Sequence, residues 1–111
     1  MDEALFRRML PVFLAEAGEC LAAMEGAIDR LAADAFDREA RDHMARGAHT
    51  IRGNAASLGL RVMTDHALRL ERWALLPPTE SPDWMIAELR LACAGLRGML
   101  GEIAAECPVD A

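Results

Sequence analysis

The chain has 111 residues, a length that suits one domain with a single modest core. Aromatic residues make up only 5% of it and alanine, leucine, methionine, glutamate and arginine dominate, which favours helix over sheet. The formal charge of −6 argues against a nucleic-acid binder, because that function depends on dense basic side chains. No apolar run approaches the roughly 20 residues of a membrane span, and the acidic start is no signal peptide. We therefore expect a cytoplasmic protein that binds neither nucleic acid nor membrane.

The prolines all fall where a helix would begin or end. A short helix is predicted over residues 2–9, and Pro11 is predicted to open a long helix that reaches about Ala33. A second long helix is predicted from about Asp37 to Leu58, with Gly59 as its stop.

The third predicted helix runs from about Arg61 to Leu76, where a proline-rich segment breaks the chain. Ser81 is the expected N-cap of the last helix, with Pro82 at its first position. Apolar residues recur at spacings of three and four in every helix, which is typical of helices that bury one face. The pattern predicts an all-α, antiparallel four-helix bundle with a short extra N-terminal helix, forming one domain over residues 1–111. Residues 107–111 are expected to be a frayed tail or the start of a linker, where a longer chain was cut.

The most informative residue is His49. At about 100° per residue, the apolar stripe of its helix lies roughly 140° away from it, so its imidazole is expected in solvent. Arg52 is one turn away and Gly53 four residues on. Arg52 can neutralise an anionic group, although a solvated surface charge is the ordinary alternative. Gly53 costs about 1 kcal/mol relative to alanine in a helix, which indicates either room for an approaching molecule or close packing of a neighbouring helix.

Glu71 lies on a flank of the third helix, from which it can lean toward the second. If its carboxylate reaches His49 it will accept the proton of one ring nitrogen and leave the other bare and nucleophilic; otherwise it pairs with a nearby arginine. Leu68 and Leu75 share that flank and are expected to be exposed. With Ala45 and Ala56 they can form an apolar docking patch, although scattered surface leucines are also ordinary.

A metal site is not expected. His43 points roughly 120° away from His49 on the same helix, and His66 is expected to be half-buried against the core. The three cysteines, Cys20, Cys93 and Cys107, have no metal-binding spacing and are expected to be reduced thiols.

The run from His49 to Gly59 resembles the signature of histidine-containing phosphotransfer (HPt) domains: histidine, any residue, an aliphatic, a basic residue, glycine, small residues, then a hydrophobe and glycine. The segment Phe13–Ala17, with Leu21 and Met24-Glu25, is similar to the first helix of the phosphotransfer domain at the amino terminus of the chemotaxis histidine kinase CheA. The resemblance implies that His49 is the phosphoacceptor, Arg52 the basic position, Gly53 the small position and Glu71 the acid that orients the imidazole.

The resemblance also implies the partners. An ATP-bound histidine kinase domain would phosphorylate His49, and receiver domains of the CheY-like and CheB-like kinds would accept the phosphoryl group on an aspartate. The chain has no glycine-rich phosphate loop and no acidic cluster for Mg²⁺, so ATP and Mg²⁺ are expected to come from the partners. The domain alone would be a monomeric carrier, and the parent chain a protein-histidine kinase. A transient interface below about 1,200 Å² is expected, with Asp42 and Arg46 on its charged rim.

Three positions depart from the family pattern: Arg52 stands where lysine is common, Asn54 where a smaller residue is usual, and Leu68 where some chemotaxis members have a second histidine. Two further interpretations stay open, a helical adaptor in which His49 is incidental and a free-standing phosphorelay protein. A small metal- or ligand-binding bundle is a more distant alternative.

Overall fold

The computed structural model describes residues 2–80 and 83–106, and these residues form helices and short turns without any strand. The helices are α1 Glu3–Ala33, α2 Arg38–Ser57, α3 Arg61–Ala74 and α4 Met85–Glu106, with a 3₁₀ turn at Pro78–Glu80. No helix in this part of the chain is both long and apolar enough to cross a membrane. The all-α class predicted from composition and periodicity is confirmed.

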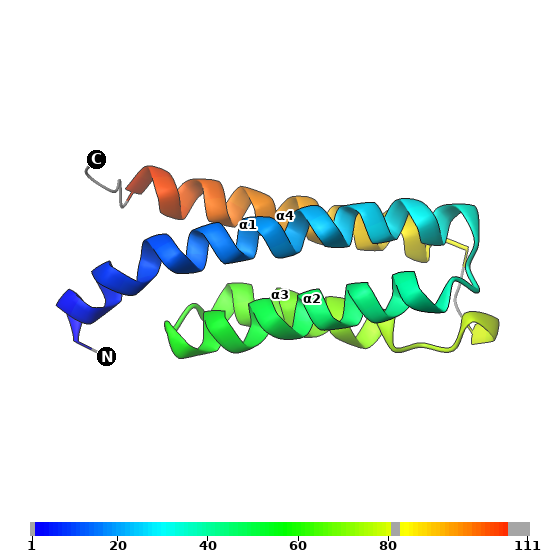
Figure 1. Cartoon of the computed structure of the whole chain (residues 1–111), viewed down its shortest axis with the longest axis horizontal. Coiled ribbons are helices and arrows are strands. Elements are labelled where there is room, and N and C mark those ends of the chain that lie inside the picture. Colours follow the sequence, from blue (N-terminus) through cyan, green and yellow to red (C-terminus); the bar gives the residue numbers. More distant parts are fainter. Residues whose placement is uncertain (1, 81–82, 107–111) are drawn as a thin grey trace.

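The four helices form an elongated antiparallel bundle of 47 × 23 × 20 Å (Figure 1). Each helix packs against the next along the chain, and α4 returns to pack against α1. Every helix contributes one buried stripe to a common core, as the three-four spacing predicts. The largest fully buried side chains are Leu21, Met24, Ile28, Met44, Ile51, Leu70, Leu89, Leu96 and Cys93. The predicted four-helix bundle is therefore confirmed.

The separate N-terminal helix predicted before Pro11 is wrong, because α1 continues through that proline. Proline in a helix interior removes one hydrogen bond and costs about 3 kcal/mol. Two features offset that cost: the Asp2 side chain caps the helix by accepting a hydrogen bond from the Ala4 backbone, and the apolar stripe continues across the proline. Leu10 is buried and Phe6 packs against the core, so breaking the helix at Pro11 would expose both.

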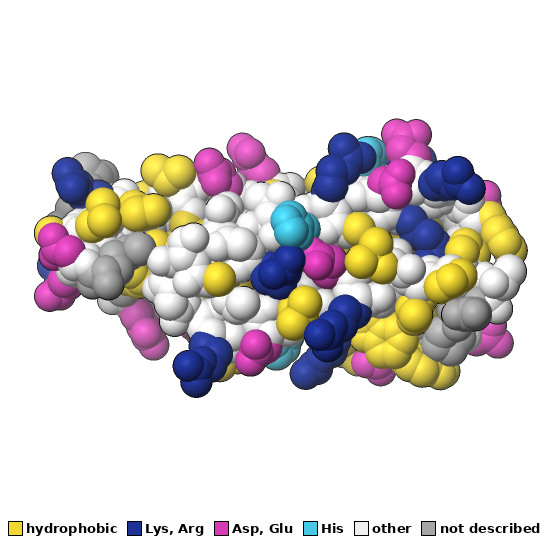
Figure 2. Space-filling view, turned by 90° about the horizontal axis from the view of Figure 1, so that it is seen from below, with side chains coloured by type: hydrophobic (Ala, Val, Ile, Leu, Met, Phe, Trp, Pro, Cys, Tyr) yellow, Lys and Arg dark blue, Asp and Glu magenta, His cyan; other side chains and the backbone are white. Residues whose placement is uncertain are grey.

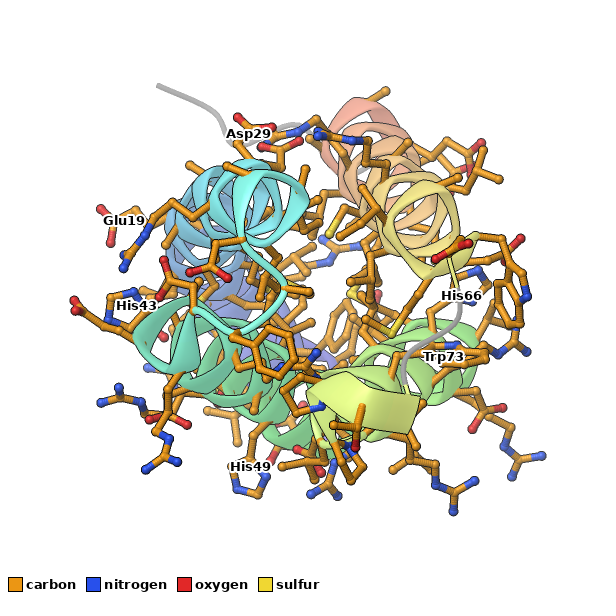
Figure 3. All side chains as sticks on the ribbon, turned by 90° about the vertical axis from the view of Figure 1, so that its right-hand side faces the viewer. Glu19, Asp29, His43, His49, His66 and Trp73 are labelled. Atoms are coloured by element: carbon orange, nitrogen blue, oxygen red, sulfur yellow. The ribbon has the colours of Figure 1, made fainter. Side chains whose placement is uncertain are left out.

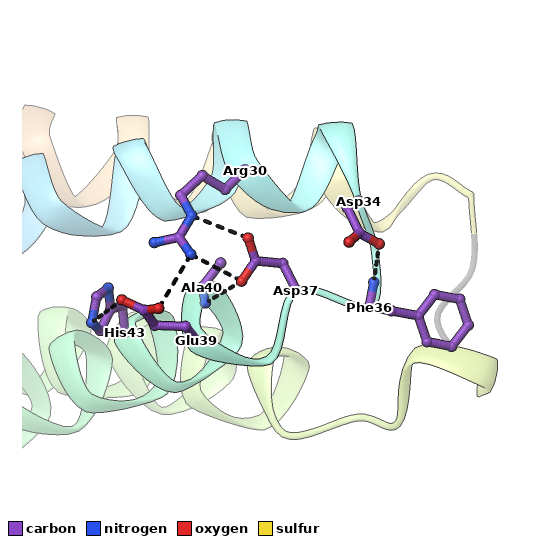
Figure 4. A network of polar contacts seen from close by, with 7 residues as sticks. All are labelled: Arg30, Asp34, Phe36, Asp37, Glu39, Ala40 and His43. Carbon is purple, nitrogen blue, oxygen red and sulfur yellow. Dashed lines mark hydrogen bonds and ion pairs between the residues drawn. The ribbon is translucent and has the colours of Figure 1, made fainter.

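The turn between α1 and α2 is held by Asp37, the N-cap of α2 (Figure 4). Its carboxylate accepts a hydrogen bond from the Ala40 backbone at 3.0 Å and two from the Arg30 guanidinium at 3.0 and 3.1 Å. The Ala40 backbone hydrogen bond, followed by the Arg30 side chain, lowers the pKa of Asp37 below its ordinary value of 3.8. This turn fixes where α2 begins, and with it the register of His49.

The other end of α2 closes with a Schellman motif. Gly59 has a φ of 73°, a left-handed conformation that favours glycine. The backbone of Gly59 donates to the Ala56 carbonyl at 3.1 Å, and that of Leu60 donates to the Ala55 carbonyl at 2.9 Å. The predicted stop at Gly59 is confirmed, and the tight turn lets α3 run back along α2.

Helix α3 ends at Ala74, two residues before the predicted Leu76, and its last turn opens toward Pro77 and the 3₁₀ turn. Proline disfavours helical backbone in the residue before it, which accounts for the earlier end. The predicted N-cap Ser81 and first-turn Pro82, and the tail 107–111, lie outside the described residues.

Cys20 and Cys93 are free thiols, as predicted, while Cys107 falls in the undescribed tail. Cys93 lies on the buried side of α4, and burial raises its pKa to about 11. Burial likewise raises the pKa of the half-buried Cys20. Both are therefore protonated at neutral pH and poorly reactive.

Candidate functional site

The candidate site is built around His49, midway along α2, which projects from the bundle where α2 lies beside α3 (Figures 2 and 3). Its side chain is 67% exposed. On the opposite side of the helix, Met44, Ala48, Ile51 and Ala55 are buried. Burial of that stripe fixes the rotation of α2, so the core itself holds His49 outward as the periodicity predicts.

Glu71 of α3 reaches His49 across the gap between the two helices. Its Oε2 lies 2.8 Å from Nδ1 of the imidazole, and its side chain is only 14% exposed. An ionised carboxylate can only accept hydrogen bonds, so this contact requires Nδ1 to carry the proton and donate it. The other ring nitrogen, Nε2, is then the unprotonated one, and among the described residues none hydrogen bonds to it.

Arg52 lies one turn from His49 and contacts both members of this pair. One guanidinium nitrogen is 2.9 Å from Nδ1 of His49, and the same nitrogen is 3.4 Å from Oε1 of Glu71. If Nδ1 instead accepted a hydrogen bond from Arg52, the lone pair of Nδ1 would face the Glu71 carboxylate oxygen. The tautomer with the hydrogen on Nδ1 therefore satisfies the cluster better. Arg52 thus places a positive charge beside Glu71 at the Nδ1 edge of the ring, while the Nε2 edge faces outward.

Gly53 is exposed, and a Cβ built on it would meet no atom within 4 Å. Close packing of a neighbouring helix therefore does not explain Gly53 within this chain. The glycine instead leaves free space beside His49. Gly47 on the same helix behaves differently, since a Cβ there would come within 2.6 Å of the buried Met24 side chain. Gly47, which periodicity did not single out, is the glycine that allows α1 and α2 to approach closely.

The residues predicted to surround His49 lie on the same two helices but differ in exposure. Asp42, Arg46 and Ala56 are exposed on α2, and Ala45 is half-buried against the core. Leu75 is 68% exposed, as predicted. Leu68 is only half-buried, not exposed, because its flank of α3 faces the closely packed α2.

The other two histidines are placed as predicted. His43 is on a different side of α2, with Nε2 3.9 Å from Glu39. His66 is half-buried beside Gly95 of α4, on the same side of α3 as Trp73, which packs edge-to-face on Trp84 with 5.1 Å between ring centroids (Figure 3). No group of three or more His, Cys, Asp or Glu side chains in the described part of the chain is placed to hold a metal ion.

Sequence reasoning missed Arg41, which is buried near the start of α2. Its guanidinium donates hydrogen bonds to the backbone carbonyls of Leu76, after α3, and Ala35, before α2. Burial lowers the pKa of Arg41. A signal was present, because Arg41 is three residues before Met44 and so lies on the buried stripe of α2. It ties the end of the helix that carries Glu71 to the start of the helix that carries His49.

The structure thus places an outward histidine in mid-helix, bonded to an acid of the neighbouring helix and followed by an arginine and a sterically free glycine. The family model named Hpt domain matches residues 8–106. The chain belongs to the Hpt family. No match was found among curated proteins, nor among solved structures.

Membership in the Hpt family assigns the chain to histidine phosphotransfer in two-component signalling. Hpt domains generally interact with histidine kinases and with response regulators. The match covers α2, α3, α4 and most of α1, and therefore includes the whole His49 cluster.

Proposed function

We propose that this Hpt domain carries a phosphoryl group on Nε2 of His49, accepting it from a chemotaxis-type histidine kinase and passing it to receiver domains. The observation that carries the proposal is the 2.8 Å contact between Nδ1 of His49 and Glu71. It leaves a bare nitrogen on the outward edge of an exposed ring, which a transfer reaction requires at its nucleophile.

The forward step forms one bond and breaks one. The lone pair on Nε2 attacks the γ-phosphorus of ATP in line, and the bond from that phosphorus to the bridging oxygen breaks, releasing ADP. The imidazole keeps its Nδ1 proton, so the ring of the product carries positive charge beside the Glu71 carboxylate. Phosphoryl transfer depends mainly on such positioning and charge stabilisation.

The onward step reverses the roles. A carboxylate oxygen of the receiver attacks phosphorus, the bond between phosphorus and Nε2 breaks, and its electron pair returns to the ring. Glu71 again holds the ring by Nδ1, so the same geometry serves both directions. ATP and Mg²⁺ are supplied by the partners in this proposal, and the domain by itself is a carrier.

Arg52 and Gly53 complete the proposed site. Arg52 neutralises charge beside Glu71, and its guanidinium can turn toward the phosphoryl oxygens once these are present, because its side chain is still 32% exposed. Gly53 leaves open space one turn from His49 for the approaching partner. Ala45, Ala56, Leu68 and Leu75 would contact the partner around the site.

The chemotaxis assignment is supported by the resemblance of α1, in the segment that includes Phe13, Ala17, Leu21 and Met24, to that branch of the family. Its consequence is that residues 1–111 would form the phosphotransfer domain of a longer cytoplasmic protein-histidine kinase, with CheY-like and CheB-like receivers downstream. The half-buried Leu68 occupies the place of the second histidine of some members, so within the described residues the His49 ring is held by Glu71, with Arg52 beside the pair.

The decisive experiment incubates the protein with labelled ATP and the catalytic domain of a chemotaxis-type histidine kinase. We expect acid-labile, alkali-stable label on the wild type, none on His49→Gln, and normal label on the matched variants His43→Gln and His66→Gln. Transfer of that label to a receiver would complete the proposal. Label that survives His49→Gln, or no label with any of a panel of such kinases, would contradict it and favour an adaptor without chemistry.

A further inference from the structure

The arginines are distributed unevenly along this acidic chain. Residues 38–76, which form α2, α3 and their connections, contain seven arginines and four acidic residues, a net charge of +3. The remaining residues contain five arginines and fourteen acidic residues, a net charge of −9. The third of the sequence that carries His49 is therefore basic, whereas the rest, which forms α1 and α4, is strongly acidic.

The arginines inside and outside residues 38–76 also differ in their partners. Outside residues 38–76, ion pairs join Arg7 to Glu3, Arg30 to Asp37, Arg90 to Asp29 and Arg97 to Glu25. Among the arginines outside residues 38–76, only Arg8 has no acidic partner in the described structure. Positive charge on α1 and α4 is thus largely neutralised where it stands.

On α2 and α3 the exposed arginines are left without such partners. Within residues 2–80 and 83–106, no ion pair is made by the five exposed arginines, which are Arg38, Arg46, Arg61, Arg69 and Arg72. Figure 2, which shows the side of the bundle formed by α2 and α3, has basic side chains around an exposed histidine, with an acidic side chain close by. We call the exposed surface of α2 and α3 around His49 the basic face; it carries Arg38, Arg46, Arg61 and Arg72 together with the acidic Glu39, Asp42 and Asp65, whereas Arg69 lies roughly 160° from Glu71 around α3.

We propose that the basic face attracts and docks an acidic partner surface, and that this partner is the receiver domain that accepts the phosphoryl group. The inference rests on the proposed function, and it adds the chemical character of the surface that His49 must meet. Exposed arginines without local partners supply the charge for long-range attraction, and they are free to pair with carboxylates across an interface.

The chemistry of the acceptor makes it the acidic partner. A group that accepts a phosphoryl on a carboxylate and holds the Mg²⁺ needed for transfer must gather several carboxylates at one place. A phosphoryl group on His49, with the Nδ1 proton kept on the ring, adds about −1 to a chain that is already at −6. Without a local excess of arginine, the phosphorylated protein and such an acceptor would repel each other as they met.

The test measures the second-order rate constant for transfer from the phosphorylated protein to a receiver domain. Loading His49 with phosphoramidate, which transfers its phosphoryl group and releases ammonia, keeps the kinase out of the measurement. The variant is Arg46→Glu with Arg72→Glu, and the matched control is Arg7→Glu with Arg8→Glu, which changes the net charge equally on α1. Thermal unfolding and the transfer rate at saturating receiver show whether each variant is folded and chemically competent.

At about 0.1 M salt we expect the α2–α3 variant to lower the rate constant by about tenfold and the α1 control to change it by less than about twofold. The difference should vanish near 1 M salt, where the Debye length falls from about 10 Å to about 3 Å. Equal effects of the two variants, a rate indifferent to salt, or faster transfer by the α2–α3 variant would each overturn the inference.

The two proposals can fail separately. If His49 cannot be phosphorylated, or its phosphoryl group reaches no receiver, the proposed function fails. If transfer proceeds but ignores charge on the basic face, only this inference fails. A charge effect seen with the kinase and not with the receiver would also overturn it, because the acidic partner would then be the kinase.

Discussion

His49 and Glu71 are 22 positions apart in the sequence, yet Nδ1 of one lies 2.8 Å from Oε2 of the other. Neither residue sets that distance alone. Burial of the apolar stripes of α2 and α3 fixes the rotation of each helix, and the Gly59 turn fixes their relative shift along the hairpin. The site is thus a consequence of how the hairpin packs.

Replacement of Glu71 by glutamine should let the neutral His49 ring populate both of its tautomers. A glutamine amide can donate to Nδ1 as well as accept from it, so Nε2 would carry the proton in part of the molecules. Losing a charge-assisted hydrogen bond of about 1.5–3 kcal/mol corresponds to about 10- to 100-fold slower phosphorylation of His49. The ¹⁵N chemical shifts of the ring report the tautomer, and single-turnover labelling reports the rate.

The matched control for Glu71→Gln is Glu39→Gln, because Glu39 pairs with His43 on the outside of α2. It should leave both the His49 shifts and the labelling rate unchanged. An unchanged tautomer in Glu71→Gln would show that Glu71 does not control the ring.

The Gly53→Ala variant should be more stable than the wild type but slower in phosphoryl transfer. The new methyl group meets nothing within the chain, so helix propensity predicts a free energy of unfolding higher by about 1 kcal/mol. If a partner uses the space beside His49, the same variant should transfer its phosphoryl group more slowly. Chemical denaturation and transfer kinetics measure the two effects.

Gly26→Ala serves as the comparison for Gly53→Ala, since Gly26 of α1 is equally exposed and equally free of neighbours. It should gain the same stability with no kinetic change. Identical transfer rates for both alanine variants and the wild type would mean that Gly53 leaves no space that a partner needs.

Methionine at Arg41 should loosen the end of the bundle near Leu76. The change removes hydrogen bonds from the buried guanidinium to the carbonyls of Leu76 and Ala35, while it keeps most of the apolar stem. A loss of about 2 kcal/mol in the free energy of unfolding is expected, since each such charge-assisted bond contributes on that scale. Urea denaturation measures it, and Arg38→Met, at an exposed position of the same helix, should cost far less. Equal losses would assign no structural role to Arg41.

Asp37 should make stability depend on pH at the acidic end. Its pKa is lowered in the folded protein by the Ala40 backbone and by Arg30, so its contribution is fully present above the ordinary value of 3.8. That contribution is lost as the pH falls through the lower folded value. The difference in unfolding free energy between wild type and Asp37→Asn should therefore be largest near neutral pH and shrink below about pH 4. Thermal or urea unfolding across that range would show it, and a difference independent of pH would contradict the assignment.

The sequence by itself was sufficient for the class and for the orientation of His49. Apolar residues at positions 44, 48, 51 and 55 specify which side of α2 is buried, and hence that His49 points away from it. Gly59 likewise specifies the stop of α2, because a left-handed residue there is compatible with glycine above all. These features depend on local periodicity and backbone sterics, which a single sequence contains.

Pro11 shows where local rules are insufficient. Taken alone it predicts a helix start, but burial of Leu10 and Phe6 on the far side of it keeps the helix continuous. The energy that decides the outcome comes from contacts with other helices, and no local rule includes them. Arg41 is similar, since the carbonyls that justify its burial belong to distant backbone.

Sequence alone determined that the His49 imidazole faces outward on a helical bundle with an arginine and a glycine beside it. Only the tertiary structure decided that Glu71 meets Nδ1, that Gly53 leaves open space, and that five exposed arginines of α2 and α3 make no ion pair within the described residues. The physical reason is that the two kinds of feature depend on interactions at different separations along the chain. Periodicity fixes which way each helix faces, whereas distances between helices and the pairing of charges follow from how the buried stripes interlock.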